Sequence, residues 1–208
     1  MSPQSNAIAL AIAARRYTEV TIDATRLVRV TSHQNGEPYW SCARNNRFDC
    51  PNSGTQYGVN YSAPTLSAAF AESVLHDDRH FDQSRARWVV SDIGLLSRRW
   101  VVNLQRVLMP TLLLFPLFGD FLTSMNIKNS ISSGDDYSLT QEMSQVIYEN
   151  APNIDGIAYV SNRANRSIAV ALFERSGTSV QQMPNMYTPL KSHPNFGAVI
   201  SQFGLDII

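Results

Sequence analysis

One glutamate, Glu72, is the only charged residue in the stretch 57–75 and is the first candidate for chemistry in this chain. Pro64 suits the first turn of a helix. The small and apolar side chains that follow at helical spacing are Leu66, Ala69, Phe70 and Ser73. A carboxylate in such a helix either finds a cationic partner or stays poorly solvated, and both situations are more typical of a functional site than of a solvated surface.

Four further side chains could act with this carboxylate: Tyr61, Arg47, Arg29 and Ser161. Tyr61 lies on a predicted strand that leads into the helix, Arg29 lies on an extended segment, Arg47 belongs to a polar loop, and Ser161 ends a buried strand. Guanidinium groups bind phosphates and carboxylates as planar forks, and a serine hydroxyl donates or accepts. Structural alternatives stay open, namely a helix carboxylate paired with an arginine, a core aromatic ring, loop-tying ion pairs and a turn serine.

A fold of class α+β is predicted from the elements that must position these side chains, because strands dominate, helices lie between some of them and no fixed repeat occurs. Besides the helix that carries Glu72, helices are expected over 6–14, 118–125 and 138–150. Strands are expected over 19–22, 27–31, 88–92, 99–103, 106–109, 156–161 and 167–173. The polar segments 41–55, 76–87 and 126–137 are expected to be a functional loop, a linker and a mobile loop.

The charge balance argues against a nucleic-acid partner. Seventeen basic residues balance seventeen acidic ones, so no broad cationic field exists to hold a phosphate backbone. A length of 208 residues with 44% hydrophobic content fits one domain, 1–208, with one sizeable core. The most apolar stretch, 107–118, is too short to span a bilayer and is expected to lie in that core.

Cysteine and histidine spacing predicts no metal site. Cys42 and Cys50 lack a nearby Cys-x-x-Cys or histidine pair, and His76 and His80 lack an adjacent glutamate at zinc-protease spacing. Free thiols are favoured because nothing marks the chain as secreted, which predicts a cytoplasmic location, while a local disulfide stays open as an alternative.

Four sequence blocks occur in an order that carries a family resemblance. The first is Leu27-Val28-Arg29-Val30, and the second is Arg47-Phe48-Asp49 followed by Pro51 and Gly54. The third is a tyrosine eleven residues before a glutamate, Tyr61 and Glu72. The last is Thr140-Gln141, then Asp155-Gly156-Ile157-Ala158-Tyr159-Val160-Ser161, then Val170-Ala171-Leu172-Phe173.

In this order the blocks resemble the RES domain, which is named for an Arg, a Glu and a Ser and is found in bacterial toxins paired with an Xre-type antitoxin. The resemblance extends over most of the chain, with its core motifs in 27–173. It implies an ADP-ribosyltransferase-like mixed fold with central antiparallel sheets flanked by helices. It also implies cleavage of NAD⁺ between nicotinamide and ribose, with the ADP-ribosyl unit passing to inorganic phosphate or to water.

That activity gives each candidate residue a role. Because nicotinamide leaves as a neutral base from a cationic substrate, the main task is to stabilise positive charge on the ribose, for which Glu72 is the candidate. Tyr61 would stack on or hydrogen-bond near nicotinamide, Arg47 and Arg29 would bind pyrophosphate or the incoming phosphate, and Ser161 would hold the carboxamide or the ribose. NAD⁺ is the expected substrate, inorganic phosphate an expected co-substrate, and no metal or other cofactor is required.

The expected partner is the Xre-type antitoxin, which would cover or enter the substrate cleft, and self-association as a homodimer stays open. The enzymatic alternative is a mono-ADP-ribosyltransferase that modifies a protein, since fold and carboxylate would serve either acceptor. The non-enzymatic alternative is a module that binds a nucleotide or a partner without turnover. Neither nucleic acid nor a membrane is expected to bind. Arg163 and Tyr57 are expected to be a solvated charge and a packing ring.

Overall fold

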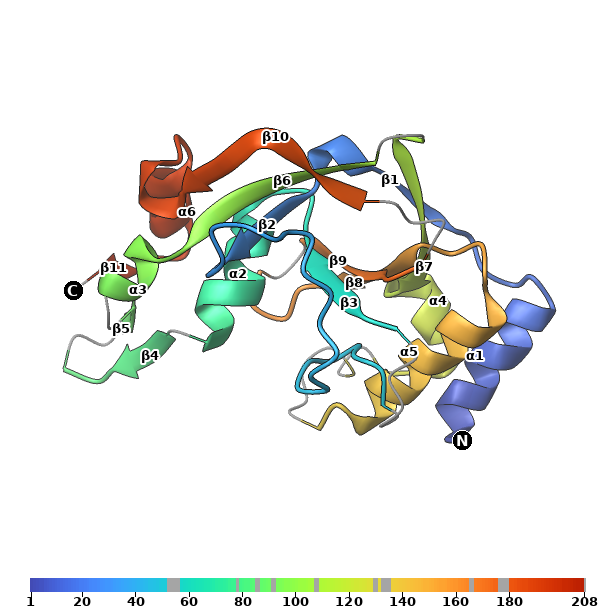
Figure 1. Cartoon of the computed structure of the whole chain (residues 1–208). Coiled ribbons are helices and arrows are strands. Elements are labelled where there is room, and N and C mark those ends of the chain that lie inside the picture. The colour runs from blue at the N-terminus through green and yellow to red at the C-terminus, as the bar shows by residue number, and fades with distance from the viewer. Residues whose placement is uncertain are drawn as a thin grey trace.

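The computed structural model describes residues 1–51, 57–77, 79–84, 87–90, 93–106, 109–128, 131, 136–164, 167–175 and 180–207. Within them, helices and strands alternate without segregating into an all-helical and an all-strand part (Figure 1). The fold is therefore of the predicted α+β class, with sheets flanked by helices.

The central sheet has five strands in the order β1-β7-β8-β9-β3. All neighbours are antiparallel except β7 and β8, which run parallel. The strands are β1 (Val20–Asp23), β7 (Thr111–Leu117), β8 (Gly156–Val160), β9 (Ile168–Phe173) and β3 (Val59–Ser62). The interior strands β7, β8 and β9 are nearly continuous apolar runs and almost wholly buried, as expected for strands covered on both faces.

Two smaller sheets complete the strand content. One has the order β10-β6-β2 and the other has the order β11-β5-β4. Their strands are β10 (Val180–Pro189), β6 (Trp100–Arg106), β2 (Val28–Thr31), β11 (Asp206–Ile207), β5 (Arg87–Val90) and β4 (Arg79–Asp82). A backbone bridge between Val28 and Ala63 ties β2 to the end of β3, so Arg29 and Tyr61 approach each other from two different sheets.

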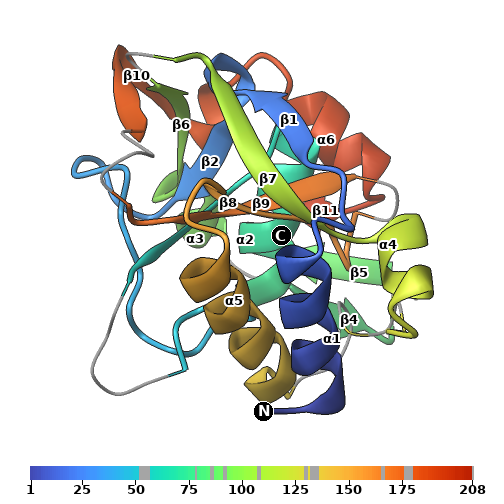
Figure 2. The ribbon, with the colours of Figure 1, turned by 90° about the vertical axis from the view of Figure 1, so that its right-hand side faces the viewer.

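The helices are α1 (Pro3–Ala13), α2 (Leu66–Asp77), α3 (Ile93–Ser97), α4 (Gly119–Ser124), α5 (Ser138–Asn150) and α6 (Phe196–Gln202), with 3₁₀ turns at Ala24–Arg26 and Leu190–Ser192. Helices α1 and α5 pack side by side (Figure 2), and α2 packs against β2. Phe70, Val74 and Leu75 of α2 are buried, and the fully buried Ala68 and Ala71 allow close approach of the helix to its neighbours. This packing fixes the helix that carries Glu72.

Several sequence-based expectations about elements need correction. The segment 76–87 is not a linker, because α2 continues to Asp77 and β4 follows it. Of the strand expected over 106–109, Arg106 is the last residue of β6, and residues 107–108 lie outside the described part. Sequence reasoning missed β10, α6 and β11. Gly54, Asp92 and most of 129–135 fall outside the described residues.

The apolar stretch 107–118 largely forms β7, and its residues Leu112, Leu114, Phe115 and Leu117 are fully buried. Among the described residues, no helix is long and apolar enough to cross a bilayer.

Candidate active site

A pocket of about 470 Å³ opens between α2, β2, β3, the end of β8 and the loop that follows β2. Ligand pockets commonly have volumes of a few hundred cubic ångströms or more. Its polar lining residues include Arg29, His33, Tyr39, Asn46, Arg47, Tyr61, Glu72, His76, Arg99, Tyr137, Tyr159 and Arg163. Four of the five predicted site residues therefore line one pocket, and the fifth, Ser161, touches it through Glu72.

The carboxylate of Glu72 is held at both oxygens. The hydroxyl of Tyr159 donates to Oε2 over 2.6 Å, and the hydroxyl of Ser161 donates to Oε1 over 2.6 Å. Tyr159 lies on β8 and Ser161 directly follows this strand. Because residues two positions apart along a strand point to the same face, both hydroxyls reach Glu72 from the same side. The carboxylate thus faces the pocket in a fixed orientation.

Ser161 also starts the turn that follows β8. Its side-chain oxygen accepts from the backbone N–H of Ala164 over 3.1 Å, and its side chain is fully buried. One hydroxyl therefore joins the turn to the carboxylate of Glu72. This placement makes Ser161 a residue that positions Glu72.

Tyr159 stays a proton donor. Burial first, and then the charge of Glu72, raise the pKa of this phenol well above its usual value, so the hydroxyl keeps its proton at ordinary pH. Its ring packs against Phe48 with a centroid distance of 4.8 Å. Tyr159 belongs to the motif 155–161, but the sequence gives no role for it. Only the fold brings its hydroxyl next to Glu72.

The hydroxyl of Tyr61 is used within the protein. It accepts from the backbone N–H of Phe48 over 2.9 Å and donates to Oδ1 of Asp49 over 3.0 Å. Burial and the nearby Asp49 raise the pKa of Tyr61 well above its usual value. Tyr61 thus ties the Arg47-Phe48-Asp49 block to β3 while lining the pocket.

The loop that carries Arg47 is held in place by side chains of α5. The side-chain amide of Gln141 donates to the carbonyls of Arg44 and Asn46, and Ser144 donates to the carbonyl of Phe48. The guanidinium of Arg47 then donates to the carbonyl of Ile131 over 2.7 Å and lies over the ring of Tyr137, 4.8 Å from its centroid. Arg47 forms part of the pocket wall.

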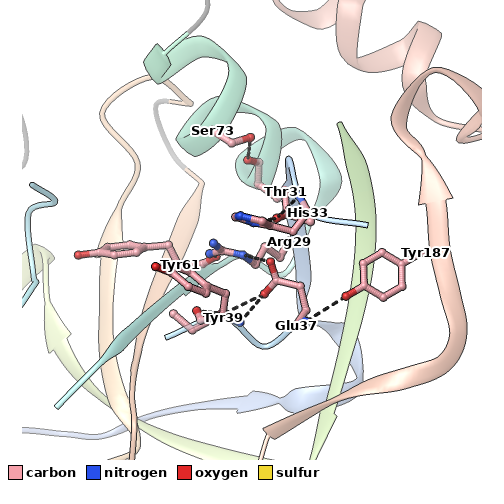
Figure 3. Close-up of polar contacts among 10 residues, drawn as sticks. Arg29, Thr31, His33, Glu37, Tyr39, Tyr61, Ser73 and Tyr187 are labelled. Atoms are coloured by element: carbon pink, nitrogen blue, oxygen red, sulfur yellow. Dashed lines mark hydrogen bonds and ion pairs between the residues drawn. The ribbon is translucent and has the colours of Figure 1, made fainter. Parts of the chain in front are cut away.

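Arg29 has a carboxylate partner that the sequence did not reveal. Its Nε donates to Oε1 of Glu37 over 2.9 Å and its Nη1 donates to the carbonyl of Tyr61 over 2.8 Å (Figure 3). The Glu37 side chain is fully buried and also accepts from the backbone N–H of Tyr39. The charge of Arg29 is therefore compensated by Glu37, although its guanidinium lines the pocket.

Sequence reasoning missed three other lining residues. Arg163, expected to be a solvated charge, lies on the pocket wall two residues after Ser161. Tyr137 and His76 meet across the pocket rim, with 3.3 Å between the phenol oxygen and Nε2. The signal for Arg163 was its place directly after a strand that ends in a site residue. No sequence pattern pairs the other two.

No group of three or more histidine, cysteine, aspartate or glutamate side chains that could hold a metal ion occurs in the described parts of the chain. Cys42 is exposed and Cys50 is buried, and both are free thiols.

Comparisons with known proteins show the family of this chain and a shared fold. The family model described as the RES domain matches residues 24–193. No curated protein matches the chain. A similar solved structure is the crystal structure of the M. tuberculosis MbcT–MbcA toxin–antitoxin complex, with a TM-score of 0.62 and 15% identity, covering 95% of this chain and 96% of that chain. The structural likeness supports the fold, and because the family model spans most of the chain, the protein belongs to the RES domain family.

Proposed function

We propose that this protein cleaves NAD⁺ at the bond between nicotinamide and ribose and transfers the ADP-ribosyl unit to inorganic phosphate or water. The observation that carries the proposal is the carboxylate of Glu72, which lines a pocket and accepts a 2.6 Å hydrogen bond at each oxygen. A carboxylate fixed in this way can stabilise a cation that forms next to it without first having to reorient.

The chemistry needs such an anion more than it needs an acid. When the C1′–N1 bond breaks, its electron pair goes to the nicotinamide nitrogen, which was positively charged and becomes neutral. Positive charge develops on the ribose ring instead, and Glu72 would stabilise it. An oxygen of phosphate or water then bonds to C1′ and loses a proton, giving ADP-ribose 1-phosphate or ADP-ribose.

The other pocket residues would bind and orient the substrate. Arg47 presents a guanidinium to the pocket and would contact substrate phosphates. The ring of Tyr61 would pack near nicotinamide, because its hydroxyl already serves Phe48 and Asp49. Arg29 would contribute hydrogen-bond donors rather than net charge, since Glu37 compensates it. We propose that Ser161 positions Glu72 and does not itself contact the substrate.

We further propose that the protein is the toxin of a toxin–antitoxin pair and that its partner is an Xre-type antitoxin that covers the pocket. Family membership and the fold shared with a structure solved as a toxin–antitoxin complex support this proposal. Bacterial growth arrest on expression, relieved by co-expression of the partner, is the expected behaviour.

The test is product analysis of the purified protein incubated with NAD⁺, with and without inorganic phosphate. We expect nicotinamide release together with ADP-ribose 1-phosphate or ADP-ribose. Label from NAD⁺ that appears on protein in a cell extract would instead identify a mono-ADP-ribosyltransferase. Saturable NAD⁺ binding without nicotinamide release would identify a binding module and contradict the proposal.

A further inference from the structure

Arg163 is a pocket residue with which no carboxylate of the described residues forms an ion pair. It lines the pocket together with Glu72. Its Nε is buried and has no hydrogen-bond partner in the described part of the chain. A buried donor of this kind is costly for stability, so a native protein that keeps one calls for an explanation such as a ligand.

The described residues on either side of Arg163 are joined by backbone hydrogen bonds. The backbone N–H of Ser161 donates to the carbonyl of Ser167 over 3.0 Å, and that of Ser167 donates to the carbonyl of Ala164 over 2.8 Å. The side chain of Ser161 caps the N–H of Ala164 from inside the turn. Arg163 therefore lies between Ser161 and Ala164, which are tied to each other by a hydrogen bond.

Three other charged residues of the pocket have partners of their own. Both oxygens of Glu72 are taken by the hydroxyls of Tyr159 and Ser161. Arg29 is compensated by Glu37, and one donor of Arg47 is held by the carbonyl of Ile131. The pocket thus keeps an anion for a cationic reacting centre and, separately, a cation for an anionic group of the ligand.

We propose that Arg163 binds a phosphate group in this pocket. The planar guanidinium matches the geometry of phosphate oxygens. Because Nε is buried in this structure, a two-bond contact requires the side chain to turn so that Nε and one terminal nitrogen both reach phosphate oxygens. Which molecule contains this phosphate group rests on the proposed function. That function offers two sources, the pyrophosphate of NAD⁺ and the free phosphate that accepts the ADP-ribosyl unit. Both present the same chemistry to Arg163.

The experiment measures binding directly and not through turnover. The full-length chain and its Arg163→Gln variant are titrated calorimetrically with adenosine diphosphate and, separately, with inorganic phosphate. Loss of a charge-assisted contact should weaken the affected probe by about tenfold or more. Weaker binding of adenosine diphosphate alone identifies the pyrophosphate, and weaker binding of inorganic phosphate alone identifies the acceptor; both support the proposal.

Two further variants control the experiment. Arg163→Lys keeps the charge and loses the fork, so we expect a smaller loss of affinity than with Gln. Arg16→Gln removes an exposed arginine that does not line the pocket and should bind both probes as the wild type does. The unfolding midpoint of Arg163→Gln should equal or exceed that of the wild type, because Nε has no hydrogen bond in the described part of the chain to lose.

Wild-type affinity of Arg163→Gln for both probes would overturn the inference, as would a wild-type protein that binds neither probe. A lowered unfolding midpoint with unchanged affinities would show that Arg163 has a structural role and would overturn it too. If Arg163→Gln binds both probes as the wild type does and also releases nicotinamide normally, only this inference fails. If the wild type releases no nicotinamide while Arg163→Gln loses affinity, only the proposed function fails.

Discussion

Replacing Tyr159 with Phe removes one oxygen atom, the one that donates to Oε2 of Glu72 over 2.6 Å. The ring keeps its contact with Phe48, so the core around it stays packed. The carboxylate then retains only the hydrogen bond from Ser161 and gains freedom to rotate away from the orientation that the pocket needs. The variant therefore isolates the positioning of Glu72 from its charge.

The size of the effect follows from the bond that is lost. A hydrogen bond to a charged group contributes about 1.5 to 3 kcal/mol, which corresponds to roughly 10- to 150-fold in rate if the bond is needed in the transition state. The loss should appear in kcat as well as in kcat/KM, because positioning matters most when charge develops. Stability should change little, since Oε2 of Glu72 faces a pocket open to water.

Initial rates of nicotinamide release over a range of NAD⁺ concentrations provide the assay. Tyr57→Phe is the matched control, because it also removes a buried phenol oxygen, here one bonded to Ser144 over 3.0 Å and not part of the pocket lining. We expect Tyr57→Phe to retain wild-type kcat. A Tyr159→Phe variant that is folded and as fast as the wild type would refute the positioning role of this hydroxyl.

Three further outcomes are expected. Ser161→Ala should lower both the rate of nicotinamide release and the unfolding midpoint, because it removes the cap on Ala164 as well as a bond to the carboxylate; a lower rate with an unchanged midpoint would contradict the dual role. Gly156→Ala should destabilise the fold by about 2 kcal/mol or more in chemical denaturation, since its Cβ would lie 2.3 Å from the carbonyl oxygen of Ala171, and wild-type stability would show that β8 can shift. Burial raises the pKa of Asp49 above its ordinary value, partly offset by hydrogen bonds, so the folded form binds more protons than the unfolded form. The wild type should therefore lose stability relative to Asp49→Asn as pH rises from about 4, and a stability difference that is constant with pH would contradict this.

The sequence was most informative where local rules decide the structure. A lone carboxylate in a small-residue helix made Glu72 the first candidate for a site, because a charge there either finds a cationic partner or stays poorly solvated; the partners in the structure are two hydroxyls and not a cation. Two short apolar runs on either side of a polar turn predicted β8 and β9 with nearly correct bounds. Spacing between Tyr61 and Glu72 placed both on one pocket, since a strand feeds directly into a helix.

Non-local pairing explains what the sequence did not reveal. The partner of Arg29 is Glu37, in a loop eight residues away whose path depends on contacts with β3 and with Tyr187 of β10. The loop around Arg47 is held by side chains of α5, far along the chain. The segment 76–87 carries charges typical of a linker, yet its residues 79–82 form β4 and pair with β5. Pairing partners of a strand are set by tertiary context and not by composition.

The measurement that tests the central claim most directly is the rate of nicotinamide release by Glu72→Gln at saturating NAD⁺, with NAD⁺ affinity measured on the same preparation. Glutamine keeps the shape of the side chain and removes its charge. If Glu72 stabilises the ribosyl cation, the rate falls by about a hundredfold or more while NAD⁺ still binds and the protein stays folded. A variant that binds NAD⁺ and releases nicotinamide at the wild-type rate would contradict the account.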